Sequence, residues 1–90
     1  MALYMVVEHF RGHELEIYRR FRERGRQMPD GLRYVSSWVQ EDFARCFQLM
    51  ETEDRALLDQ WIAKWKDLAD FEVQAVVSSA EAAARIEPRL

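Results

Sequence analysis

Apolar and polar side chains alternate along residues 32–51 in a way that is typical of two paired β-strands. The segment reads LRYVSSWVQ, then EDFA, then RCFQLME, so two runs of strand length flank a short polar corner. Folding it at its middle places Arg33 opposite Glu51 and Val35 opposite Leu49, and such pairs stabilise antiparallel strands. The corner lacks Asn-Gly and Asp-Gly, so the sequence predicts a hairpin with a four- or five-residue loop.

Segments with strand and helix periodicity alternate along the rest of the chain. Short stretches rich in β-branched and aromatic side chains predict strands, and apolar side chains at three- and four-residue steps predict amphipathic helices. A capping box, Ser-Ser-Ala-Glu, opens a last short helix before Pro88. The predicted elements are, in order, strand 2–10, helix 13–24, strands 32–40 and 45–51, helix 52–68, strand 70–77 and helix 78–86.

Two local signals refine these boundaries. Thr52 is a good N-cap residue, and acidic side chains follow it in the first helical turn. Residues 28–31, Met-Pro-Asp-Gly, have proline second and glycine fourth, which predicts a type I turn leading into the hairpin.

The order of elements predicts the fold class. Strand, helix, strand, strand, helix and strand form the split βαβ arrangement of a ferredoxin-like α+β fold, here with a short C-terminal helix. Ninety residues predict a single domain, residues 1–90. Right-handed crossovers place both long helices on one face of the sheet. By alternation, we expect the uncovered face to carry Tyr4, Val6, Glu8, Phe10, Tyr34, Ser36, Trp38, Cys46, Gln48, Met50, Glu72 and Gln74.

An exposed apolar face of this size is uncommon on a monomer and marks an interaction surface. The simplest cover is a second copy that presents the same face across a two-fold axis. We therefore expect a homodimer closed sheet to sheet, with polar side chains lining one or two cavities between the two sheets.

Two glutamates are the candidate catalytic groups. Glu8 lies near the end of the first strand and Glu72 near the start of the last, and these strands are antiparallel neighbours in this topology. We expect the two carboxylates to meet at one end of the cavity, where one pKa rises and the group serves as a general acid or base. The alternative is that each glutamate pairs with an arginine or reaches solvent.

Four other side chains are candidates for ligand binding. Tyr34, Ser36, Trp38 and Gln48 combine aromatic rings with hydroxyl and amide groups, which would orient a flat, partly polar ligand. The alternative is that they only pack the interface.

The cysteine, the histidines and a cluster of arginines were also considered as reactive or binding groups. Cys46 is expected to be a buried, unreactive thiol, because neither His9 nor His13 is expected to reach it. The two histidines have metal-like spacing, but Gly12 interrupts the helix that such a site needs. The arginines of residues 19–26 form either an anion-binding patch or a solvated helix end, since glutamates interleave with them.

Composition narrows the class of partner. The net charge of −3 gives no basic field for nucleic acid. The longest apolar run, residues 2–7, is far shorter than the ~20 residues of a membrane span. One cysteine excludes an internal disulfide. No secretory signal is visible, so we expect a cytoplasmic protein. We also expect the protein to need no metal and no nucleotide cofactor.

Four segments, LYMVVEHF, RERGRQMPDGLRYVSSWV, DFARCFQLMETED and DQWIAKWKDLADFEV, resemble a small bacterial domain family of unknown function in the dimeric α/β-barrel superfamily. The resemblance covers nearly the whole chain, and DFARCFQLMET is its most specific part. It transfers no catalytic residue. The wider superfamily includes cofactor-independent oxygenases, haem-degrading enzymes, lactone isomerases and ligand-sensing domains, and the Asn–Trp–His set of the haem-degrading members has no match here.

Two functional interpretations follow. The first is a small enzyme of oxygenase or isomerase type that works without a cofactor on an aromatic or enolisable metabolite. The second is a non-catalytic dimeric module that binds a small ligand or only assembles. Fold-level resemblance does not choose between them.

Overall fold

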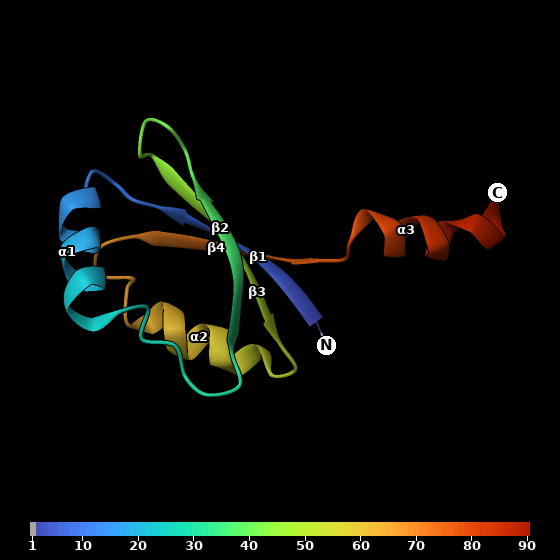
Figure 1. Ribbon diagram of the computed structural model, residues 1–90, viewed down its shortest axis with the longest axis horizontal. Helices are drawn as coiled ribbons and strands as arrows, with labels where there is room; N and C mark the ends of the chain where they lie inside the picture. Colours follow the sequence, from blue (N-terminus) through green and yellow to red (C-terminus); the bar gives the residue numbers. More distant parts are fainter. Residues whose placement is uncertain (1) are drawn as a thin grey trace.

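The computed structural model describes residues 2–90 and has the predicted ferredoxin-like α+β fold (Figure 1). Its four strands form one antiparallel sheet in the order β2-β3-β1-β4. The elements are β1 (Ala2–His9), α1 (Glu14–Arg24), β2 (Arg33–Val39), β3 (Arg45–Thr52), α2 (Arg55–Ala63), β4 (Asp70–Val76), α3 (Ser79–Ile86) and the 3-10 turn η1 (Glu87–Arg89).

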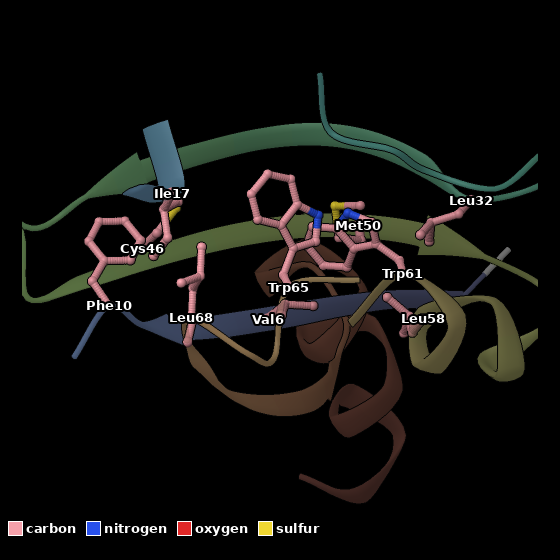
Figure 2. Close-up of a cluster of buried hydrophobic side chains, with 11 residues drawn as sticks. Val6, Phe10, Ile17, Leu32, Cys46, Met50, Leu58, Trp61, Trp65 and Leu68 are labelled. Atoms are coloured by element: carbon pink, nitrogen blue, oxygen red, sulfur yellow. The ribbon is translucent and has the colours of Figure 1, made fainter. Parts of the chain in front are cut away.

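The hydrophobic core lies between the two longer helices and one face of the sheet. Val6 of β1 and Met50 of β3 are completely buried, and so is Leu58 of α2. Trp61 and Trp65 lie over the same face, which agrees with the expectation that the tryptophan stripe belongs to the core. Figure 2 shows these buried side chains as one continuous row along the strands. Burial of this apolar surface is the main force that holds the helices on the sheet.

The core corrects the prediction of which face is uncovered. Val6, Glu8 and Phe10 were expected on the bare side, yet all three are buried beneath the helices. The alternation along β1 was predicted correctly, but Leu3 and Met5 on the opposite parity are equally apolar, so hydrophobicity alone could not choose the face. The residues wrongly assigned to the uncovered face are Tyr4, Val6, Glu8, Phe10, Tyr34, Cys46, Gln48 and Met50.

An irregularity at Val35 shifts the register of the hairpin. The first two pairs of β2 and β3 agree with the predicted register, but from Ser36 onward every partner is displaced by one residue. The extra residue turns the rest of β2 over, as β-bulges do. Ser37 and Val39 now face the helices, whereas Ser36 and Trp38 face the other side of the sheet.

Two boundary predictions are also displaced. Asp54 rather than Thr52 caps α2, since the Asp54 side chain accepts a hydrogen bond from the backbone N–H of Ala56. The turn before β2 begins at Pro29, whose carbonyl accepts from the N–H of Leu32 at 3.3 Å. Gly31 is therefore the third turn residue, with a φ of 91°. That position and sign belong to a type II turn rather than the predicted type I.

Two surfaces of the described chain lack a cover. The first, which we call the open face, is the side of the sheet opposite the helices, and its apolar centre consists of Leu3, Met5, Val7, Phe47 and Leu49. The second is the arm, residues 77–90, in which every residue is exposed. Figure 1 shows α3 extending away from the sheet beyond the end of β4. None of the helices described in residues 2–90 is long and apolar enough to cross a membrane.

Candidate functional site

A pocket opens between α1, α2 with the segment that follows it, and the helix-covered face of the sheet. Its volume is about 110 Å³. That is somewhat less than the ~150 Å³ apolar cavity that holds a benzene molecule. Its polar lining consists of Glu8, Arg26, Ser37 and Gln48, beside the thiol of Cys46. Much of the remaining wall is aromatic: Phe10, Tyr18, Phe21, Trp61 and Trp65.

Glu8 supplies a buried carboxyl group to this pocket. The residue is only 6% exposed, and its cross-strand neighbours are Cys46 on β3 and Phe71 on β4. Burial raises the pKa of Glu8 from 4.5 to about 7, although the hydrogen bond from Gln48 lowers it. Near neutral pH the group is therefore present in both protonation states, as a general acid or base requires.

Gln48 lies beside Glu8 on the adjacent strand β3 and fixes its carboxyl group. The Gln48 Nε2 donates to Oε1 of Glu8 at 2.9 Å. Both side chains are buried, so this amide replaces hydrogen bonds that the carboxyl group would make to water. Gln48 is thus the predicted ligand-binding residue that does line the pocket, and its hydrogen-bond partner there is Glu8.

Arg26 enters the pocket from the segment that connects α1 to β2. Its carbonyl oxygen accepts hydrogen bonds from two indoles, Trp61 Nε1 at 2.9 Å and Trp65 Nε1 at 3.1 Å. Its guanidinium carbon lies 3.7 Å from the centre of the Tyr34 ring and 5.0 Å from that of Phe21. Among residues 2–90, no carboxylate forms an ion pair with Arg26. The cation is held by aromatic faces, and its charge is available to an anionic group in the pocket.

Cys46 remains a neutral thiol in this setting. Burial, and to a smaller extent the charge of Glu8, raise the pKa of Cys46 from 9.0 to about 12. Arg26 acts in the opposite direction but does not offset them. Because the thiolate is the reactive form of cysteine, a nucleophilic role for Cys46 is disfavoured, in line with the expectation of an unreactive thiol.

The two predicted catalytic carboxylates do not meet. Glu8 pairs across the sheet with Phe71, so the next residue, Glu72, points to the opposite face. There Glu72 Oε1 lies 3.0 Å from His9 Nε2, close to solvent. The prediction placed Glu8 and Glu72 on the same face of the sheet. In the antiparallel pairing, however, Glu8 lies directly opposite Phe71, so Glu8 and Phe71 share a face and Glu72 does not.

The predicted ligand-binding residues are likewise divided between the two faces. Tyr34 lies behind the pocket, where its hydroxyl group is 2.6 Å from Ser37 Oγ and its ring stacks on Arg26. Ser36 and Trp38 lie on the open face because of the bulge, and Trp38 is 56% exposed. The structure therefore brings together Glu8 and Gln48 and leaves Glu72, Ser36 and Trp38 outside the pocket.

Two pocket residues were not predicted. Ser37 was assigned to the opposite parity, and no local signal in Tyr-Val-Ser-Ser-Trp reveals the bulge at Val35 that turns it inward. Arg26 was grouped with the arginines at the end of α1, of which Arg22 and Arg24 are exposed. Its position after Gly25, beyond the helix end, was the available sign that its environment differs from theirs.

Comparison with known families assigns the chain to a family but not to an activity. The sequence profile of a family described as Domain of unknown function (DUF3303) matches residues 2–90. The chain belongs to this DUF3303 family. No curated protein and no solved structure matches it significantly. The resemblance to a family of unknown function is thereby confirmed, and what the DUF3303 pocket does has to be argued from its own geometry.

Proposed function

We propose that the pocket binds a small molecule and moves a proton on it, with Glu8 as the general acid and base. The observation that carries the proposal is a buried carboxyl group, with a pKa raised to about 7, that lines an accessible pocket. At neutral pH a useful fraction of such a carboxyl group is ionised, and the driving force for proton transfer to it is favourable.

The reaction is an enolisation that can complete as an isomerisation. Ionised Glu8 takes a proton from the carbon next to a carbonyl group, and the electrons of that C–H bond move onto the carbonyl oxygen. The resulting enolate is stabilised by the positive charge of Arg26. Protonated Glu8 then returns the proton to another atom of the enolate, so atoms and electrons balance without a cofactor.

The pocket supports a restricted substrate class. Its volume of about 110 Å³ and aromatic walls favour a planar group of about the size of one six-membered ring. Arg26, which lacks a carboxylate partner among the described residues, favours a substrate with an anionic or strongly polarised oxygen. A small aromatic or 1,3-dicarbonyl compound combines these properties.

Two finer expectations are retained within this proposal. The sheet order β2-β3-β1-β4 supports kinship with the dimeric α/β-barrel superfamily, although fold alone transfers no activity. The buried free thiol of Cys46 is compatible with the cytoplasm, the expected compartment. The proposed site differs from the expected one: it lies within one chain, between the helix-covered face of the sheet and the helices, rather than between the sheet face and a partner.

Hydrogen exchange at carbon tests the proposed proton transfer without knowledge of the natural substrate. Small 1,3-diketones and arylpyruvates serve as probes: protein-dependent incorporation of deuterium from D₂O at their acidic carbon is measured by NMR. We expect exchange with the wild-type chain and a loss of at least tenfold in Glu8→Gln, which keeps the acceptor for Gln48 but cannot take a proton.

The matched control is Glu72→Gln, which makes the same chemical change on the open face and should leave the exchange rate unchanged. Parallel titrations measure probe affinity, and Arg26→Gln should weaken it about tenfold through loss of a charge-assisted hydrogen bond. Binding that Arg26→Gln weakens, without exchange in any variant, would support the alternative, a non-catalytic ligand-binding module. Oxygen uptake during exchange would indicate an oxygenase that begins with the same deprotonation. Equal exchange in Glu8→Gln and wild type would refute the role of Glu8.

A further inference from the structure

Tyr18 on α1 brings a phenol to the pocket wall that the proton transfer at Glu8 does not use. The side chain is 43% exposed, so it forms part of the boundary between the pocket and solvent. Among residues 2–90 its hydroxyl group forms no hydrogen bond, whereas the hydroxyl group of Tyr34, behind the pocket, is 2.6 Å from Ser37 Oγ. A phenol can donate one hydrogen bond, and Tyr18 has that donor available for a bound molecule.

The ring of Tyr18 lies over the part of the sheet that carries Glu8. It packs edge-on against Phe10, with ring centres 6.1 Å apart and planes at 82°. Phe10 follows Glu8 by two residues, and both are buried beneath the helices. Ile17, the residue before Tyr18, is buried with Phe10 and Cys46 at one end of the row of core side chains (Figure 2). Cys46 is the cross-strand neighbour of Glu8, so these contacts bring Tyr18 to the same end of the pocket as the Glu8 carboxyl group.

The electrostatic surroundings of the Tyr18 hydroxyl group agree with an inward orientation. Burial is the largest cause of the raised pKa of Tyr18; Cys46 and Glu8 raise this pKa further, and Arg26 lowers it. All three of these neighbours line the pocket. Water would weaken their influence on a hydroxyl group directed into bulk solvent. The raised pKa also keeps the phenol protonated at neutral pH, so its O–H remains a donor.

Phe43, in the loop between β2 and β3, also contacts the Tyr18 ring. The two ring centres are 6.3 Å apart and the planes meet at 80°. Phe43 has a φ of 61°, which is unusual for a bulky residue, although its side chain is 49% exposed. The loop is tied to β1, because the carbonyl of Ala44 accepts a hydrogen bond from the N–H of Phe10 at 3.0 Å. Backbone strain of this kind persists where the surrounding structure fixes it, often at functional sites.

We propose that Tyr18 is a second catalytic residue of the pocket: its hydroxyl group donates a hydrogen bond to the substrate oxygen that becomes the enolate oxygen, and Phe43 positions its ring. The inference rests on the proposed enolisation at Glu8. Negative charge grows on that oxygen while Glu8 takes the proton from carbon, so the hydrogen bond from Tyr18 strengthens in the transition state. Tyr18 keeps its own proton throughout, and Arg26 supplies the positive charge.

Deuterium exchange into arylpyruvates tests the role of the hydroxyl group when kcat and KM are measured separately. Tyr18→Phe removes only the hydroxyl group, and loss of one donor to a developing oxyanion costs about 10²–10³ in kcat. We expect kcat to fall at least tenfold, while KM changes less because the bond to the neutral carbonyl group is weaker. The matched control is Tyr4→Phe, which removes a hydroxyl group from a tyrosine of β1 outside the pocket and should leave both constants unchanged.

Substitutions of Phe43 test the positioning role. Phe43→Ala removes the ring and keeps a non-glycine residue at the positive φ, so it isolates the contact with Tyr18. We expect a severalfold lower kcat with little change in KM. Phe43→Tyr keeps the aromatic ring and should retain the wild-type kcat. Since Phe43 is half exposed, circular dichroism should show an unchanged fold in both variants.

An NMR titration of tyrosine isotope-labelled at Cζ supplies a readout that does not depend on activity. The Tyr18 signal is assigned by its absence from Tyr18→Phe. Its hydroxyl group should titrate at lower pH in Glu8→Gln, which removes a negative charge, and at higher pH in Arg26→Gln, which removes a positive one. The Tyr4 signal should not move. If neither substitution shifts the Tyr18 titration, the hydroxyl group does not face the pocket and the proposal is overturned.

The exchange assay separates failure of this inference from failure of the proposed function. Equal kcat values for wild type and Tyr18→Phe would overturn the role of Tyr18 and leave that of Glu8 intact. A wild-type chain without exchange would overturn the proposed function and the catalytic role of Tyr18 with it. A wild-type kcat in Phe43→Ala would overturn only the positioning role of Phe43.

Discussion

Gln48 donates a hydrogen bond of 2.9 Å from Nε2 to Oε1 of Glu8 inside the pocket. Among residues 2–90, no cation forms an ion pair with this carboxyl group, and burial raises its pKa to about 7. The Gln48 amide therefore positions the Glu8 carboxyl group but does not keep it ionised at neutral pH. A lysine or arginine at the same place would favour the carboxylate and lower the pKa.

Substitution of Glu8 by Gln should stabilise the protein at pH 8 but not at pH 4.5. Between pH 4.5 and about 7 the folded chain keeps the Glu8 proton that the unfolded chain has lost. The stability linked to Glu8 is thus complete below pH 4.5 and falls as the pH rises to about 7. A pKa change from 4.5 to about 7 corresponds to roughly 3 kcal/mol. Urea unfolding from pH 4 to 8.5 measures the difference.

Glu72→Gln provides the comparison for this pH series. Glu72 is exposed on the opposite face of the sheet, so its substitution should give only a small difference from wild type. A Glu8→Gln difference that stays constant across the series would mean that the burial of Glu8 is not linked to its ionisation.

Cys46 should react very slowly with aromatic disulfide reagents in the folded protein. At pH 8, a pKa of about 12 in place of 9.0 lowers the thiolate fraction about a thousandfold, and burial restricts access further. The release of thionitrobenzoate in buffer and in 8 M urea measures the two rates. Rapid native reaction with one equivalent of reagent would contradict this and would reopen a nucleophilic role.

The amino-acid pattern was sufficient to predict the order of the elements and the alternation within most strands, because both depend on local periodicity. It did not determine which side of β1 meets the helices. Val6 and Phe10 lie on one side and Met5 and Val7 on the other, and both sides are apolar. Only packing against the tryptophans of the α2 region, a long-range relationship, distinguishes the two sides.

The candidate site was harder to predict, for two physical reasons. The extra residue at Val35 moves each later side chain of β2 to the opposite face of the sheet. Bulges of this kind have weak sequence signals. Arg26 reaches the pocket through hydrogen bonds from Trp61 and Trp65, which are 35 and 39 positions away along the chain. The raised pKa of Glu8 was anticipated for one of two glutamates, but its cause is burial rather than a second carboxylate.

The two indoles that share the Arg26 carbonyl should be energetically coupled. In Trp61→Phe or Trp65→Phe the carbonyl oxygen keeps one donor, so each single change should cost about 1–3 kcal/mol from lost packing and one hydrogen bond. The double variant leaves the oxygen with neither indole, and an unsatisfied, part-buried acceptor adds about 1 kcal/mol. Chemical unfolding of the four proteins gives the coupling energy as a double-mutant cycle. Additive effects within 0.3 kcal/mol, roughly the usual scatter, would mean that water replaces the donors.

Gly31 should tolerate a methyl group less well than Gly12 does. Both glycines have positive φ, 91° and 80°, so alanine at either position costs about 1 kcal/mol or more in backbone strain. A Cβ atom at Gly31 would in addition lie 2.9 Å from Cδ1 of Leu57, whereas one at Gly12 would meet nothing within 4 Å. Leu57 packs against the core and is only half-buried, so its side chain can move at a cost.

We therefore expect Gly31→Ala to lower the free energy of unfolding by about 1–2 kcal/mol more than Gly12→Ala, with the excess arising from the contact with Leu57. Leu57→Ala removes that contact and allows the excess to be tested directly. In the Leu57→Ala background the two glycine substitutions should cost the same, although the background itself is less stable. If Gly31→Ala stays more costly there, the clash with Leu57 is not the cause, and the turn that leads into β2 constrains Gly31 through its backbone alone.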